Sequence, residues 1–160
     1  MSELESGGFQ PVIDDAQITD RAKIKRIVVC SGKVYYDLEA ARDSATSATA
    51  PAAAAAADPV AIVRLEQFYP FPAKALVDIF ASYPNVTEIV WTQEEPQNMG
   101  GWTFVAPRLQ AITPANAKLR YIGRDASASP ATGSYAIHNL EQANLVNDSL
   151  TIGTVSVART

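Results

Sequence analysis

Short apolar runs rich in β-branched residues recur along the chain and alternate with longer segments of mixed polarity. Runs this short and this apolar are typical of strands buried on both faces of a parallel sheet. The sequence predicts four such strands, at residues 23–30, 60–65, 86–91 and 119–122.

Each run is followed by a segment whose apolar residues fall at helical spacing. These segments predict helices at residues 34–42, 72–80, 102–112 and 134–146. Pro107 lies inside the third segment, so that helix is expected either to start late or to bend there. In the last segment Tyr135, Ile137, Leu140 and Leu145 are the apolar positions. Four strand–helix repeats predict a three-layer α/β/α domain with a largely parallel sheet.

The chain of 160 residues is long enough for one well-packed domain. Residues 1–22 are expected to form a linker or an extended arm, and residues 23–150 the domain. Residues 44–59 are rich in alanine and bracketed by prolines, which predicts a surface insertion. Residues 151–160 are expected to be a tail.

The segment from Trp91 to Trp102 joins the third strand to the third helix and contains Glu94, Glu95, an amide cluster and two glycines. Ligands and partner surfaces are usually found at this place in α/β sheets. A flexible turn with an acidic helix start is the favoured interpretation when this segment is taken alone. Adjacent carboxylates in a strand would point to opposite faces.

Composition excludes several classes of function. The formal net charge of −4 gives no basic field for nucleic acid, and no apolar run is long enough to span a membrane.

Cys30 is the single cysteine and lies in a strand, which predicts a buried thiol. His138, the single histidine, is expected to cap or pack. The sequence contains no serine nucleophile elbow, metal-ligand cluster or dinucleotide fingerprint.

The turns after the predicted strands resemble those of one family, the C-terminal domain of the thiamine-dependent first component of 2-oxoglutarate dehydrogenase. The similarity covers about residues 8–150 and continues through the last helix. The matching motifs are Ser31–Leu38 (SGKVYYDL), Val63–Gln67 (VRLEQ), Tyr69–Pro72 (YPFP), Gln93–Gly100 (QEEPQNMG), Tyr121–Arg124 (YIGR) and Ser127–Gly133 (SASPATG). The chain departs from the family pattern in the alanine-rich insertion and at residues 151–160.

The resemblance implies a transketolase C-terminal-domain-like fold. In the family, the whole enzyme decarboxylates 2-oxoglutarate on thiamine diphosphate with Mg²⁺ and passes the succinyl group to a lipoyl group of the second component, a step of the tricarboxylic acid cycle. Two other domains hold the cofactors. The resemblance therefore implies that this chain binds no cofactor, supplies no catalytic group and is inactive alone, as a fragment or a split gene product.

The resemblance also implies a role in stabilising a homodimer and in supporting the catalytic domains, with the sheet-edge turns facing the pyrimidine-binding domain. Some family members bind acetyl-CoA or a nucleotide as an effector, for which Lys33, Arg64 and Arg124 are candidates. Ion pairs with Glu66, Glu94 or Glu95 explain these cations equally well.

Two other functions remain open, a free protein-interaction module of a 2-oxo acid dehydrogenase complex and a small flavodoxin-like ligand-binding protein. The form of the motif around Met99 and the alanine-rich insertion favour a eukaryotic protein, and therefore the mitochondrial matrix. A bacterial protein would be cytoplasmic.

Overall fold

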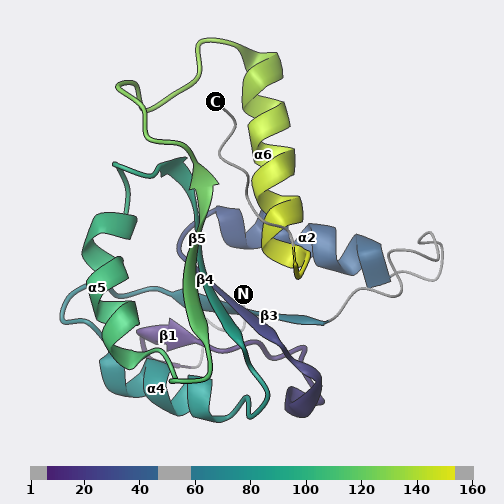
Figure 1. Cartoon of the computed structure of the whole chain (residues 1–160), viewed down its shortest axis with the longest axis vertical. Coiled ribbons are helices and arrows are strands. Elements are labelled where there is room, and N and C mark those ends of the chain that lie inside the picture. Colours follow the sequence, from purple (N-terminus) through teal and green to yellow (C-terminus); the bar gives the residue numbers. More distant parts are fainter. Residues whose placement is uncertain (1–6, 47–58, 154–160) are drawn as a thin grey trace.

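A five-stranded sheet forms the centre of the structure, a computed structural model that describes residues 7–46 and 59–153 (Figure 1). The strand order is β1-β3-β2-β4-β5; β1 pairs antiparallel with β3, and the other neighbours are parallel. The strands are β1 (Val12–Ile13), β2 (Arg26–Cys30), β3 (Val60–Leu65), β4 (Glu88–Pro96) and β5 (Lys118–Arg124).

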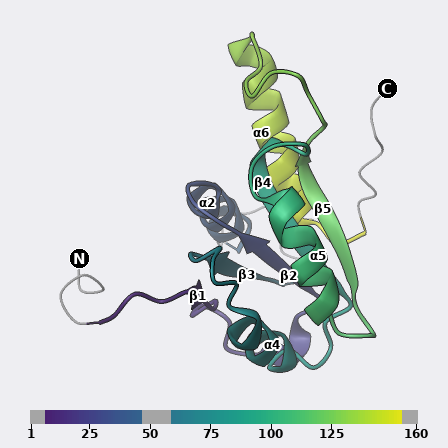
Figure 2. The ribbon, with the colours of Figure 1, turned by 90° about the vertical axis from the view of Figure 1, so that its left-hand side faces the viewer.

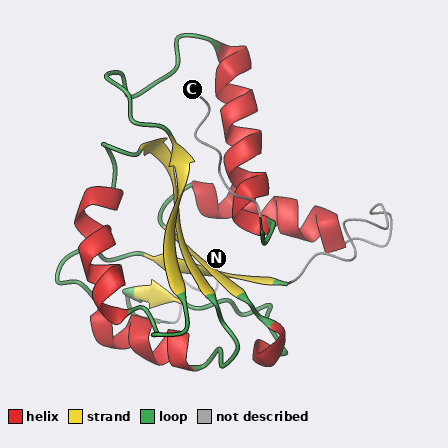
Figure 3. Ribbon diagram, in the orientation of Figure 1, coloured by secondary structure: helices red, strands yellow, loops and turns green. Residues whose placement is uncertain are grey.

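Helices cover both faces of the sheet, with α2 and α6 on one face and α4 and α5 on the other (Figures 2 and 3). The helices are η1 (Arg21–Lys23), α2 (Val34–Thr46), α4 (Ala73–Ala81), α5 (Trp102–Ile112) and α6 (Tyr135–Leu150). The prediction of a three-layer α/β/α fold with a largely parallel sheet is therefore confirmed.

Strand β2 contributes to both hydrophobic cores because its side chains alternate between the two faces. Ile27 and Val29 pack towards α4 and α5, whereas Val28 and Cys30 pack towards α2 and α6. Burial raises the pKa of the Cys30 thiol to about 12, so the thiolate is scarce at neutral pH. The expected buried thiol is confirmed.

The segment predicted as a linker or arm runs along the sheet edge in its later part. Val12 pairs with Leu65, and the carbonyl oxygen of Pro11 accepts hydrogen bonds from the backbone N–H groups of Glu66 and Gln67 at 2.9 and 3.0 Å. Helix α2 extends to Thr46, inside the predicted insertion. Residues 47–58 of the insertion and 154–160 of the tail lie outside the described residues.

Strand β4 is longer than predicted and ends at Pro96 instead of Trp91. Its extension is held by β5, since the backbone N–H of Gln97 donates to the carbonyl oxygen of Arg124 at 3.0 Å. The prediction of an acidic helix start at Glu94 and Glu95 was therefore wrong, because both residues belong to the strand.

Helix α5 spans the predicted residues and contains Pro107 in its interior. Proline has no backbone N–H, so the helix loses one internal hydrogen bond there. Val105 and Leu109 are fully buried against the sheet, and their packing keeps the helix in place.

Helix α6 differs most from the expected pattern. Tyr135, Ile137 and Leu140 are exposed, whereas Leu145 and Ser149 are its buried residues. Its N-terminal half extends past the end of the sheet, so these apolar side chains have no sheet beneath them (Figure 1).

Polar contacts from Arg26 fix the other end of α6. The Arg26 side chain is fully buried, and its Nη1 donates to the carbonyl oxygens of Asp148 and Ser149 at 2.6 and 2.9 Å. Its Nε donates to Glu88 Oε2 at 2.6 Å. Carbonyl groups in the last turn of a helix have no hydrogen-bond donor within the helix. Arg26 supplies the donor for two of them.

We expect Arg26→Ala to lower the free energy of unfolding by about 3–5 kcal/mol. The substitution removes one partner of a buried ion pair and leaves two carbonyl groups of α6 without their hydrogen-bond donor. Urea denaturation measures the change. Lys74→Ala is the matched control, since Lys74 forms a solvent-exposed ion pair with Asp78 and should matter little. A loss below about 1 kcal/mol for Arg26→Ala would contradict this account.

Glu88 should make stability depend on pH. Burial by itself raises the pKa of Glu88, but Arg120 and Arg26 outweigh it, and the pKa is lowered overall. Because the pKa of Glu88 is lower in the folded state than in the unfolded state (about 4.3), the ionised carboxylate stabilises the fold at pH values above about 4.3. This stabilisation is lost as the pH falls through the pKa of the folded state. The stability difference between wild type and Glu88→Gln should therefore shrink as the pH falls from 7 to 3. A constant difference in urea titrations would argue against this role.

Candidate functional site

The carboxyl ends of the four parallel strands lie at one edge of the sheet, together with the turns that follow them. From β2 the chain passes to β3 on one side, and later to β4 on the other. Such a reversal opens a crevice between the two neighbouring strands, where α/β proteins usually bind ligands. The ends of β2 and β4 are therefore the first place to search for a site.

An ion-pair network occupies this position. Lys33 Nζ lies 2.9 Å from Asp37 Oδ2 and 3.1 Å from Glu94 Oε1, and these hydrogen bonds raise the pKa of Lys33. Gln142 Nε2 donates to the same two oxygens at 2.8 and 2.9 Å. The network connects α2, β4 and α6. Its charged groups pair with one another inside the domain.

The other two candidate cations also have carboxylate partners. Arg64 Nε lies 3.5 Å from Glu66 Oε1, and its guanidinium lies over the ring of Tyr35. Arg124 Nε lies 3.3 Å from Glu141 Oε2.

Arg124 also explains the position of the single histidine. Its Nη2 lies 2.9 Å from His138 Nδ1. A guanidinium can only donate, so Nδ1 is the acceptor in this contact. The histidine thus has a packing partner in the structure.

The structure pairs the candidate residues with different partners. Lys33 and Glu94 meet, as one of the predicted ion pairs, while Arg64 and Arg124 pair elsewhere. Glu95 is exposed and points to the opposite face from Glu94, as expected for neighbours in a strand. Sequence reasoning missed Asp37, which the i,i+4 spacing from Lys33 could have revealed, and Gln142, for which the sequence offered no signal.

The side-chain amide of Gln93 organises the turn from β4 to α5. Gln93 is buried, and its Oε1 accepts hydrogen bonds from Trp91 Nε1 at 2.8 Å and from the backbone N–H of Trp102 at 2.9 Å. Its Nε2 donates to three backbone carbonyl oxygens, those of Glu95, Pro96 and Met99, at 2.8–3.2 Å. Every hydrogen-bonding atom of the amide therefore has a partner.

Two glycines let the backbone pack closely around this turn. A Cβ atom at Gly101 would lie 2.8 Å from the ring of Phe68 and 2.9 Å from that of Trp91. At Gly123, a Cβ atom would lie 2.8 Å from the carbonyl oxygen of Gln93. The glycines and amides of this segment thus have structural reasons to be there.

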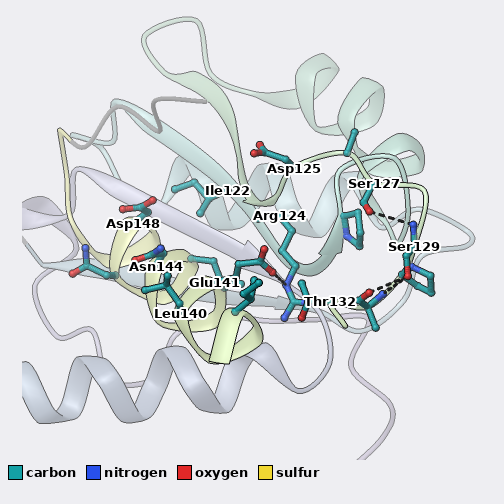
Figure 4. A pocket seen from close by; sticks show the side chains of 18 residues that line it. Ile122, Arg124, Asp125, Ser127, Ser129, Thr132, Leu140, Glu141, Asn144 and Asp148 are labelled. Atoms are coloured by element: carbon teal, nitrogen blue, oxygen red, sulfur yellow. Dashed lines mark hydrogen bonds and ion pairs between the residues drawn. The ribbon is translucent and has the colours of Figure 1, made fainter. Parts of the chain in front are cut away.

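A cleft of about 730 Å³ lies between the loop after β5 and helix α6 (Figure 4). We call it the β5–α6 cleft. The sequence analysis matched part of its loop, Ser127–Gly133, to a family motif but did not predict a cleft. The residues that line it are Pro96, Ile122–Ser127, Ser129–Thr132, Ile137, Leu140, Glu141, Asn144, Leu145, Asn147 and Asp148.

Comparison with known proteins decides the family. The family model for the 2-oxoglutarate dehydrogenase C-terminal region matches residues 1–150. The chain belongs to this family. The first component (E1) from Cupriavidus necator is 46% identical over 91% of this chain and 14% of its own length. The E1 component from Bacillus pumilus is 44% identical, covering 94% and 15%, and the oxoglutarate dehydrogenase from Buchnera aphidicola 40%, covering 95% and 16%.

The comparison confirms the resemblance drawn from the turn motifs. The chain spans only 14–16% of the length of these 2-oxoglutarate dehydrogenase relatives. These relatives are bacterial, which agrees with the cytoplasmic alternative and gives no support to the favoured mitochondrial location.

Within residues 7–46 and 59–153, no three His, Cys, Asp or Glu side chains are grouped so that they could hold a metal ion. No helix in those ranges is long and apolar enough to cross a membrane.

Gln93→Glu should destabilise the domain by about 3 kcal/mol at pH 8, because a carboxylate would face three carbonyl oxygens. The loss should be smaller at pH 5, where burial favours the protonated carboxyl group. Urea denaturation at both values measures this, with the exposed Gln97→Glu as the matched control. Equal stability of Gln93→Glu and Gln97→Glu would refute the role given to the amide.

Proposed function

We propose that this chain acts as the non-catalytic C-terminal domain of a 2-oxoglutarate dehydrogenase first component, and that it docks onto the rest of that enzyme. The observation that carries the proposal is the match of nearly the whole chain to a small part of E1 relatives. The polar groups at the usual ligand position support it, because they are paired with one another.

Two exposed aromatic side chains lie at the carboxyl edge, which is the edge of the sheet where the four parallel strands have their carboxyl ends. They support docking at this edge. Tyr36, in the first turn of α2, is 61% exposed, and Tyr69, in the turn after β3, is 82% exposed. Tyrosine is enriched at protein interfaces, where its ring is buried and its hydroxyl hydrogen-bonded. We infer that this edge faces the pyrimidine-binding domain and contributes to a homodimer.

The chemistry belongs to the whole enzyme in this proposal. Its other domains decarboxylate 2-oxoglutarate on thiamine diphosphate with Mg²⁺, and the succinyl group passes to a lipoyl group of the second component. Among the described residues of this chain we find no side chains arranged for any of these steps. The domain would act by holding the catalytic domains in place.

The effector role stays a prediction. Lys33, Arg64 and Arg124 each have a carboxylate partner, so acetyl-CoA or a nucleotide that bound these cations would compete with an ion pair. No observation favours this second role over the structural one.

A complementation experiment tests the proposed function. The Cupriavidus necator relative, truncated to remove the region matched here, is mixed with this chain, and 2-oxoglutarate decarboxylation is followed with thiamine diphosphate and Mg²⁺. We expect no activity from this chain alone and restored activity in the mixture, because docking would support the catalytic domains.

The controls separate the alternatives. A Tyr36→Ser/Tyr69→Ser variant should restore less activity than wild type. Binding without restored activity would favour the free interaction module. A folded chain that neither binds nor restores activity contradicts the proposal, and flavin or phosphate binding by the isolated chain would then favour the flavodoxin-like alternative.

A further inference from the structure

Strand β5 is the last strand of the sheet on its side, so one of its two edges has no neighbouring strand within residues 7–46 and 59–153. The backbone N–H of Lys118 donates to the Thr87 carbonyl oxygen, and the Arg124 carbonyl oxygen accepts from Gln97, so both residues face β4. Because the backbone groups of alternate residues point to opposite sides, Leu119, Tyr121 and Gly123 direct theirs to the open edge. Such an edge can pair with an added strand.

The β5–α6 cleft lies beside the end of this strand. Its helical wall consists of one face of α6, with lining residues at helical spacing from Ile137 to Asp148. That stretch is about 16 Å long, the length of about five extended residues. Ile137 and Leu140 are 50% and 57% exposed, so the cleft presents apolar side chains that nothing in the described domain covers.

The charges of the cleft favour a cation. Its lining contains one guanidinium, that of Arg124, which is paired with Glu141. Asp125, directly after β5, and Asp148, in the last turn of α6, also line the cleft. Their carboxylates form no ion pair or hydrogen bond with the residues that the structure describes. The cleft therefore has a negative net charge, and its wall on α6 combines the exposed apolar side chains of Ile137 and Leu140 with polar residues such as Asn144 and Asp148 (Figure 4).

We propose that the β5–α6 cleft binds an extended, basic segment from the remaining part of the first-component polypeptide. The segment adds as a further strand to the open edge of β5. Its apolar side chains pack on Ile137 and Leu140, and its Lys or Arg side chains pair with Asp125 and Asp148. This inference rests on the proposed function, in which most of the polypeptide lies outside this chain, and it names the second surface used for docking.

Binding of the whole chain to the truncated Cupriavidus necator enzyme tests the inference. We expect Ile137→Asp/Leu140→Asp to weaken binding at least about tenfold, because two apolar contacts are replaced by charges. Val77→Asp is the matched control, since Val77 is 42% exposed on α4, on the other side of the sheet. Asp125→Asn/Asp148→Asn should weaken binding and reduce its dependence on salt.

Amide hydrogen exchange identifies the strand pairing. In the complex, the amides of Leu119, Tyr121 and Gly123 should exchange more slowly than in the isolated chain. If the cleft variants bind as tightly as wild type and these amides are unchanged, the cleft inference is overturned while the proposed function stands.

Two further outcomes would reject the cleft inference for other reasons. If the wild-type chain does not bind the truncated enzyme, the proposed function fails as well. If the same amides exchange faster in a chain ending at Gly153 than in the whole chain, residues 154–160 fill the cleft instead of another segment.

Discussion

A fully buried guanidinium determines where the last helix lies. Arg26 connects Glu88 of β4 to the C-terminal carbonyl groups of α6, a helix with little apolar surface against the sheet. The hydroxyl groups of Thr92 and Ser149, 2.8 Å apart, add a second buried contact at the same end. The Gln142 contacts at the carboxyl edge and the β5–α6 cleft both depend on this placement. A polar interaction thus positions the surfaces from which we infer function.

The carboxyl edge shows polar residues used for construction. Gln93 satisfies two donors and three acceptors in the turn after β4, and Lys33 is held between Asp37 and Glu94. A catalytic site would need some of these groups to face a substrate. Here they face one another, which fits a domain whose role is to hold others.

Helices and strands that are set by their own local sequence were predictable. Strand β3 and helix α5 have the predicted bounds, because apolar, β-branched runs and helical spacing report local structure. The end of β4 was not predictable, because pairing with β5 and the contacts of Gln93 decide it. The exposure of Ile137 and Leu140 was not predictable either, since an apolar stripe on α6 looks the same whether it faces a core or an opening. The cleft depends on that tertiary arrangement and was missed for the same reason.

The most direct test of the central claim, that the carboxyl edge docks onto the rest of a first component, is hydroxyl-radical footprinting. Oxidation rates of Tyr36 and Tyr69 are compared by mass spectrometry in the free chain and in its complex with the truncated enzyme, with Val77 as the internal reference. We predict that both tyrosines react more slowly in the complex while Val77 is unchanged. A complex in which both tyrosines react as fast as in the free chain would contradict the account.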